Sequence, residues 1–220
     1  MNIPSLPPLT DLFALFGVNL VLCAALLRLL QASMGWPWAK WLAVGLFVLL
    51  WMPAGSAHLP LVAYVRGITS DFSVTLVLLA TIGILQRWTG RVVFGAREKH
   101  AAYAVLAVGA VALYPLAMGW GDHDPYRAGW GSAALWTLLL ALTVASWIRG
   151  LRLLPLLVAA GLLSWSAGMM ESTNLFDYLL DPWIAVGALA VSVRRLAGFV
   201  LRSDGMRSGR RGDPGAGKIQ

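Results

Sequence analysis

The sequence predicts an all-α protein that crosses a membrane several times, and two observations carry that prediction. Hydrophobic residues make up 59% of the 220 positions and charged residues only 12%, and the mean hydropathy is +0.72. A soluble domain of this length is far more polar. The apolar residues also form continuous runs, without the two-residue alternation of a membrane β-barrel. The chain is therefore expected to be a helix bundle in lipid.

Each transmembrane helix needs roughly 20 predominantly apolar residues to cross about 30 Å of hydrocarbon. Seven runs of that kind cover about residues 12–30, 39–57, 70–87, 101–119, 131–148, 153–170 and 175–193. They predict a single transmembrane domain over residues 1–202. The remaining residues, 203–220, have the Gly, Arg and Ser composition of a disordered basic tail.

The basic residues predict the orientation of the bundle. If the N-terminus is outside, 15 of the 17 Lys and Arg residues fall in the cytoplasmic connections and tail, as the positive-inside rule requires. Seven of the ten acidic residues then fall on the outer side, although they were not used to choose the orientation. We expect a multi-pass protein of the bacterial inner membrane with a cytoplasmic C-terminus. The basic pI of about 10.2 reflects this topology, so no nucleic-acid partner is expected.

The first polar segment on the predicted outer side is "HLPLVAYVRGITSDFSVT", residues 58–75. Its first part, 58–69, fits a loop, a kinked helix or a re-entrant hairpin. Thr69, Ser70 or Asp71 is expected to cap the third span. Arg66 lies a turn before that helix start, where it would bind an anionic group. The alternative is that Arg66 pairs with Asp71 or reaches lipid headgroups.

The second polar segment, "GWGDHDPYRAGWG" at 119–131, lies between the fourth and fifth spans. Asp122, His123 and Asp124 carry the ligand types that a divalent cation accepts. Asp before Pro and flanking Gly residues are equally typical of a turn, and for the motif alone a turn is the favoured interpretation. Arg127 follows within the same segment.

The third polar segment is "ESTNLFDYLLDPW", residues 171–183. Glu171 is expected to end the sixth span, and Asn174 is a good N-cap. Asp177 and Asp181 are four residues apart, which places them on one face if the helix continues into the seventh span with a kink at Pro182. Arg66, Arg127, solvent or a bound cation would offset their repulsion.

Two further features limit the chemistry. The three histidines fall on different faces, His100 inside and His58 and His123 outside, so no intramembrane haem is expected. Cys23 is the single cysteine, which excludes disulfides within the chain. Asp11, after two prolines, is interpreted as a helix cap.

A compact bundle would bring the three outer segments together, and this convergence is the functional hypothesis. The candidate residues are Arg66, Asp71, Asp122, His123, Asp124, Arg127, Glu171, Asn174, Asp177 and Asp181. The outer mouth would bind or guide an anionic, lipid-linked envelope substrate, or present that surface to a membrane or periplasmic protein partner. An intramembrane hydrolase or group transferase is the alternative, with His123 or a carboxylate of Asp122, Asp124 or Glu171 as general base and a divalent cation as cofactor. A scaffold subunit without a site is the third possibility.

Overall fold

A computed structural model describes residues 8–30 and 37–211. Within them the regular structure is helical, apart from one β-hairpin whose two strands have two residues each. In chain order the elements are α1 (Leu9–Leu29), α2 (Pro37–Leu50), β1 (Pro53–Ala54), β2 (Leu59–Pro60), α3 (Leu61–Thr69), α4 (Val74–Thr89), α5 (Ala96–Ala117), the 3₁₀ helix η1 (Pro125–Trp130), α6 (Ala133–Ile148), α7 (Leu153–Ser166), α8 (Leu175–Leu179) and α9 (Pro182–Arg211). The all-α prediction is confirmed.

Three of the described helices are long and apolar enough to cross a membrane. They are α1, α5 and the first part of α9, residues Pro182–Phe199. Four shorter helices are apolar over Trp38–Leu50, Val74–Thr89, Ala133–Ile148 and Leu153–Ser166. By length and composition the fold is therefore that of a membrane protein.

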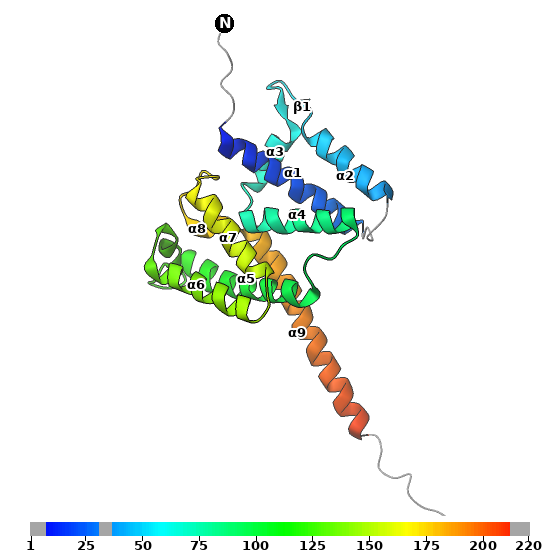
Figure 1. Ribbon diagram of the computed structural model, residues 1–220, viewed down its shortest axis with the longest axis vertical. Helices are drawn as coiled ribbons and strands as arrows, with labels where there is room; N and C mark the ends of the chain where they lie inside the picture. Colours follow the sequence, from blue (N-terminus) through cyan, green and yellow to red (C-terminus); the bar gives the residue numbers. More distant parts are fainter. Residues whose placement is uncertain (1–7, 31–36, 212–220) are drawn as a thin grey trace, which may run out of the picture.

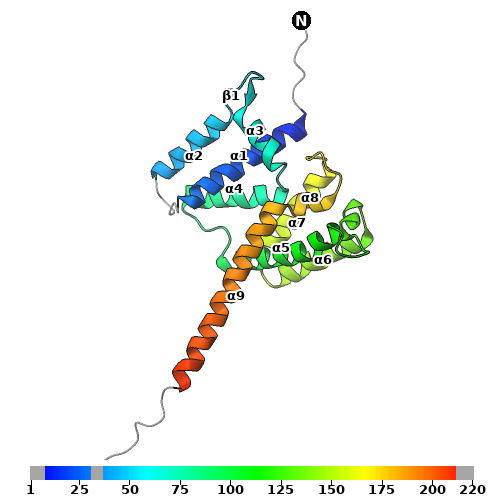
Figure 2. The ribbon, with the colours of Figure 1, turned by 180° about the vertical axis from the view of Figure 1, so that it is seen from behind.

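The helices pack in two groups that meet along α4 and α7. In the first, α1 packs against α4, α2 and α3, whereas in the second α5 packs along α9 and α6 packs on α7. Both views show that the second half of α9 extends away from the bundle (Figures 1 and 2). In Figure 1, η1 and α8 lie on one side of the bundle and the α4–α5 connection lies on the other.

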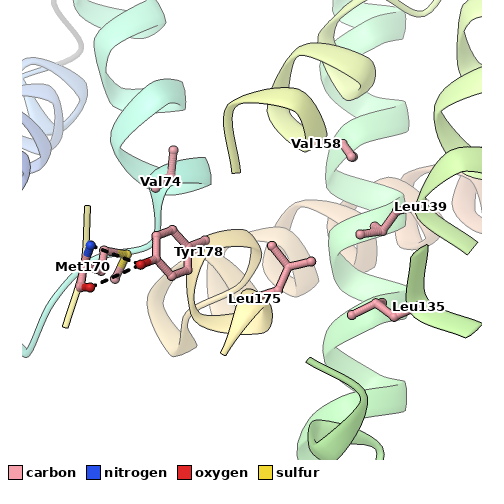
Figure 3. Packing of buried hydrophobic residues seen from close by; sticks show 7 residues of the cluster. All are labelled: Val74, Leu135, Leu139, Val158, Met170, Leu175 and Tyr178. Atoms are coloured by element: carbon pink, nitrogen blue, oxygen red, sulfur yellow. Dashed lines mark hydrogen bonds between the residues drawn. The ribbon is translucent and has the colours of Figure 1, made fainter. Parts of the chain in front are cut away.

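Tyr178 on α8 is the largest fully buried side chain among the described residues, and it anchors the junction of the two groups. It belongs to a buried cluster that also contains Val74 of α4, Leu139 of α6 and Val158 of α7 (Figure 3). The phenolic oxygen accepts a hydrogen bond from the Met170 amide at 3.1 Å and lies 3.2 Å from the Met170 carbonyl oxygen. A buried phenol needs such partners because leaving its hydroxyl unpaired would cost free energy.

The second predicted span, 39–57, ends earlier than expected. Helix α2 stops at Leu50, and the chain turns through the β1–β2 hairpin, where Gly55 has a φ of +68°. A Cβ at Gly55 would also lie 2.7 Å from the hydroxyl oxygen of Tyr64. Both the backbone conformation and this close contact therefore favour glycine at this position. The sequence allows three conformations for the segment 58–69. In the structure it contains the second strand of this hairpin, followed by α3.

The acidic segment before the last helix does not continue into that helix, and this prediction was wrong. Helix α8 ends at Leu179, Leu180 is extended with φ −149° and ψ +119°, and α9 begins at Pro182. Proline disfavours the helical conformation for Asp181, the residue directly before it, and suits the first turn of a new helix, so the break falls before Pro182. Although α9 begins only at Pro182, its apolar part reaches Phe199 and is long enough to cross a membrane.

Three other boundaries differ from the predictions. Ser73, not Thr69, Ser70 or Asp71, caps α4, with its hydroxyl accepting from the Leu76 amide at 3.2 Å. Helix α7 ends at Ser166, so Glu171 lies in the following loop. Helix α9 continues through 203–211, which we assigned to the tail because of its Gly and Ser content; no proline interrupts that stretch. Residues 212–220 of the predicted tail lie outside the described residues.

Candidate functional site

Arg66 on α3 is the centre of an ion-pair cluster that joins three distant parts of the chain. Its Nε and Nη2 donate to the two carboxylate oxygens of Asp71 at 2.6 and 3.2 Å. Its Nη1 donates to Asp11 at 2.6 Å, and Nη2 also donates to Glu171 at 3.3 Å. Asp11 lies in the first turn of α1, whose N-cap is Pro8, so it serves as an ion-pair partner and not as the expected cap.

Three carboxylates therefore share one guanidinium. The hydrogen bonds to Asp71 and Asp11 raise the pKa of Arg66 above its already high ordinary value, although burial acts in the opposite direction. Four of its hydrogen-bond contacts are already taken by acids, and the cluster carries more negative than positive charge. The sequence suggests anion binding, pairing with Asp71 or contact with lipid headgroups for Arg66, and the structure shows the ion pair with Asp71.

Asp181 links the starts of α4 and α9 through hydrogen bonds. Its side chain is buried, and its two oxygens accept hydrogen bonds from the backbone amides of Ser73 and Ile184, each at 2.8 Å. One carboxylate thus caps the first turn of α9 and satisfies the amide at the start of α4. The predicted neighbour of Asp181, Asp177, lies on a different element and has different partners.

Asp177 on α8 is held by η1. The hydroxyl of Tyr126 lies 2.8 Å from each of its carboxylate oxygens, and the hydroxyl of Ser172 donates to the same group. Burial, followed by the hydrogen bond to Asp177, raises the pKa of Tyr126 above its ordinary value. The tyrosine thus remains a neutral donor, and it is the partner of Asp177 in a place where the sequence suggests solvent, Arg66, Arg127 or a bound cation.

The close contact between η1 and the 171–181 segment depends on a glycine. Asn174 caps α8 by accepting from the Phe176 amide at 2.9 Å, as predicted, and its Nδ2 donates to the Tyr126 carbonyl at 3.0 Å. Gly129 is buried directly against the Asn174 side chain, where any Cβ would overlap it. This packing holds the loop "GWGDHDPYRAGWG" against the bundle.

The remaining candidates in that loop face outward. Asp124 caps η1 by accepting from the Tyr126 amide at 3.0 Å, which is the turn role, and Asp122, His123 and Arg127 are exposed. Arg127 forms no ion pair with any described residue. Within residues 8–30 and 37–211, no group of three His, Cys, Asp or Glu side chains has the geometry of a metal site.

Sequence reasoning missed four residues that organise this region: Ser73, Tyr126, Gly129 and Ser172. Tyr126 lies within the quoted loop, and a tyrosine directly after Asp-Pro was the available signal. Gly129 and Ser172 carried no distinguishing pattern, because their roles depend on which segments meet in space. Comparisons with protein-family models, curated proteins and solved structures find no match to this chain.

The arrangement is a polar layer whose charged groups mostly satisfy one another. Around it, Trp120 and Trp130 expose 75% and 57% of their surfaces, beside the exposed Asp122 and Asp124. Such a surface combines large exposed apolar side chains with negative charge, a combination found at contact surfaces between molecules.

Proposed function

We propose that the chain is a multi-pass protein of the bacterial inner membrane in which seven helices cross the bilayer. The crossing helices would be α1, α2, α4, α5, α6, α7 and α9, with the N-terminus outside and the C-terminus in the cytoplasm. In support, each of the seven predicted apolar runs overlaps one of these helices. The shortest of these helices, α2 and α7, have 14 residues each and span about 21 Å, and local thinning of the bilayer accommodates such a deficit.

The contacts between helix ends support the same topology. Residues of the predicted cytoplasmic side contact one another: Lys40 donates to the Trp88 carbonyl at 2.9 Å, and Glu98 accepts from the Arg152 amide at 3.0 Å. Residues of the predicted outer side likewise contact one another, as the Arg66 cluster shows. Figure 1 agrees, because η1 and α8 lie opposite the α4–α5 connection.

We propose further that the outer face presents a fixed acidic and aromatic surface to a periplasmic protein partner. The observation that carries this proposal is the pairing of Arg66 with three carboxylates. These ion pairs hold the ends of α1, α3 and the 167–174 loop in one arrangement and leave the guanidinium little capacity for a substrate anion. A partner that fits would bring basic side chains to Asp122 and Glu171 and apolar ones to Trp120.

A second candidate rests on Arg127, which is exposed and forms no ion pair with a described residue. It leaves one cation at the mouth for an anionic, lipid-linked substrate. Binding of such a substrate is the other role that the sequence predicts for the outer mouth, and photo-crosslinking separates it from binding of a protein partner.

Topology is tested first, by cysteine labelling in intact cells. In a Cys23→Ser background, a cysteine at the exposed Asp122 should react with a membrane-impermeant maleimide, whereas one at Arg149 should react only after the inner membrane is broken. The reverse order would refute the orientation, and labelling of both positions in intact cells would refute the seven-helix topology.

The partner surface is tested by site-specific photo-crosslinking in the native membrane. A photoreactive residue at Trp120 should give a defined protein adduct, while one at Leu140 on α6, which is 65% exposed, should label lipid only. Asp122→Asn with Asp124→Asn should remove the protein adduct, because these changes remove charge and keep the capping group. A lipid adduct at Trp120 that is lost in Arg127→Gln and kept in the double Asn variant would favour the anionic substrate instead.

A further inference from the structure

A second site lies away from the polar layer, in a cavity of about 710 Å³ between two pairs of helices. Helix α1 packs on α4, and α5 packs on α9, and the cavity lies where these pairs face each other. No residue of the Arg66 cluster lines it.

One wall of the cavity is an apolar strip along α4. Leu76, Leu79, Ala80 and Gly83 line it, and their spacing of three and four residues places them on a single face. Helix α9 lines the opposite side from Trp183 to Arg194. At 1.5 Å per residue this is about 16 Å, close to the depth of one leaflet of a hydrocarbon core about 30 Å thick.

The other end of the cavity is cationic. Arg28 near the end of α1, Arg87 near the end of α4, Lys99 in the first turns of α5 and Arg194 on α9 all line it. Among the described residues that line the cavity, none is acidic. An anion with several oxygen acceptors would therefore meet four positive charges there.

Gln86 lies at this cationic end and has an unsatisfied donor. The residue is 7% exposed, its Oε1 accepts from the Lys99 ammonium at 2.8 Å, and its buried Nε2 has no hydrogen-bond partner among the described residues. Buried amide donors are almost always paired because an unpaired donor costs free energy. A ligand oxygen at this end would supply the missing acceptor.

We propose that this cavity binds an anionic phospholipid, with an acyl chain along the apolar strip and the phosphate at Arg28, Arg87, Lys99 and Gln86. The apolar wall argues for a lipid because a soluble phosphate compound would leave most of it in contact with water. The site is independent of the outer polar layer and of any partner that binds there.

The test compares two lipids with the same acyl chains on the purified full-length chain in detergent. Phosphatidylglycerol carries a net negative charge and phosphatidylcholine does not, so native mass spectrometry of the two in competition should show a clear excess of bound phosphatidylglycerol. Arg87→Gln should lower that preference roughly fivefold, as expected for one cation near an anionic headgroup. Arg91→Gln is the matched control, because Arg91 is exposed and does not line the cavity, and it should change nothing.

A steric variant tests the cavity itself. A Cβ at Gly187, which lines the cavity, would have no atom within 4 Å, so Gly187→Phe should fill the space and displace the lipid without unfolding α9. Gly109→Phe on α5 is its control, since Gly109 also has open space around it and does not line the cavity.

Three results would overturn the proposal. Equal binding of the two lipids to the wild-type chain would remove the headgroup specificity. An equal loss in Arg87→Gln and Arg91→Gln, or in Gly187→Phe and Gly109→Phe, would show that the lipid binds outside the cavity. Displacement of phosphatidylglycerol by millimolar glycerol phosphate would show that the acyl chain contributes nothing and that the occupant is a soluble phosphate compound.

Discussion

Replacing Arg66 by methionine would separate a structural ion-pair cluster from a ligand-binding arginine. The change keeps an extended side chain on α3 but removes the cation that Asp11, Asp71 and Glu171 share. If Arg66 holds the outer ends of the helices together, the variant should lose stability. If the three ion pairs contribute little and Arg66 serves mainly to bind an anion, the variant should lose little stability.

The expected magnitude follows from how exposed each member is. The side chains of Arg66 and Asp71 are 21% and 22% exposed, Asp11 is 32% exposed, and Glu171 is 68% exposed. Removing one partner of a fully buried pair costs about 3–5 kcal/mol, and an exposed pair is worth about 0–1 kcal/mol. The two inner pairs lie between these limits, so Arg66→Met should lower the free energy of unfolding by about 2–3 kcal/mol. Glu171→Gln should cost under about 0.5 kcal/mol.

The measurement is denaturant unfolding of the purified chain in a mild detergent, followed by circular dichroism. Arg127→Met is the matched control, because Arg127 is exposed and has no ion pair with a described residue; it should change stability by no more than about 0.5 kcal/mol. Adding Asp71→Asn to Arg66→Met should recover part of the loss by removing one unpaired charge. Equal stability of Arg66→Met and Arg127→Met would refute the structural interpretation of the cluster.

Three further predictions use the same unfolding measurement. Gly129→Ala should cost about 1–3 kcal/mol because its Cβ overlaps Asn174, whereas Gly109→Ala in an open part of α5 should stabilise by up to about 1 kcal/mol; equal effects would contradict the packing. Asp181→Ala should cost about 3 kcal/mol, since it removes a helix cap and leaves a second buried amide unpaired; a loss below about 1 kcal/mol would contradict this link. Because the pKa of Tyr126 is raised on folding, its hydrogen bond should contribute fully below about pH 10 and weaken only at higher pH. The stability gap between wild type and Tyr126→Phe should therefore stay constant from pH 7 to 9, and a gap that closes within this range would contradict the assignment.

The helices were predictable because length and apolar content are local properties. Each of the seven runs overlaps an observed helix, and several ends agree within a few residues, as for α6, but the seventh run covers α8 as well as the start of α9. The ends that failed were decided by single residues whose partners are distant. Asp181 caps α9 because the chain turns at Leu180, and the spacing of Asp177 and Asp181 by itself equally allowed one continuous helix.

The sequence predicted which charged residues belong to the site, but it predicted fewer of the residues that contact them. Charged residues in an apolar chain are conspicuous, so Arg66, Asp71 and Glu171 were all identified, and pairing of Arg66 with Asp71 was one of the stated possibilities, beside anion binding and contact with lipid headgroups. The sequence did not reveal which neutral side chains would donate hydrogen bonds to these carboxylates. Tyr126 reaches Asp177 across 51 positions of sequence, and only the docking of η1 on α8 makes that contact.

The two polar regions differ in a way that bears on where a ligand can bind. At the predicted outer face Arg66 and Asp177 already have partners within the chain, three carboxylates for Arg66 and a tyrosine hydroxyl for Asp177. At the cationic end of the cavity, four basic side chains gather without an acid among the described lining residues, and Gln86 retains an unused donor. Like charges that line one end of a cavity repel one another unless a counter-charge offsets them. A bound anion would supply that counter-charge, so ligand binding is better supported in the cavity, and the outer layer is better suited to holding a surface in shape.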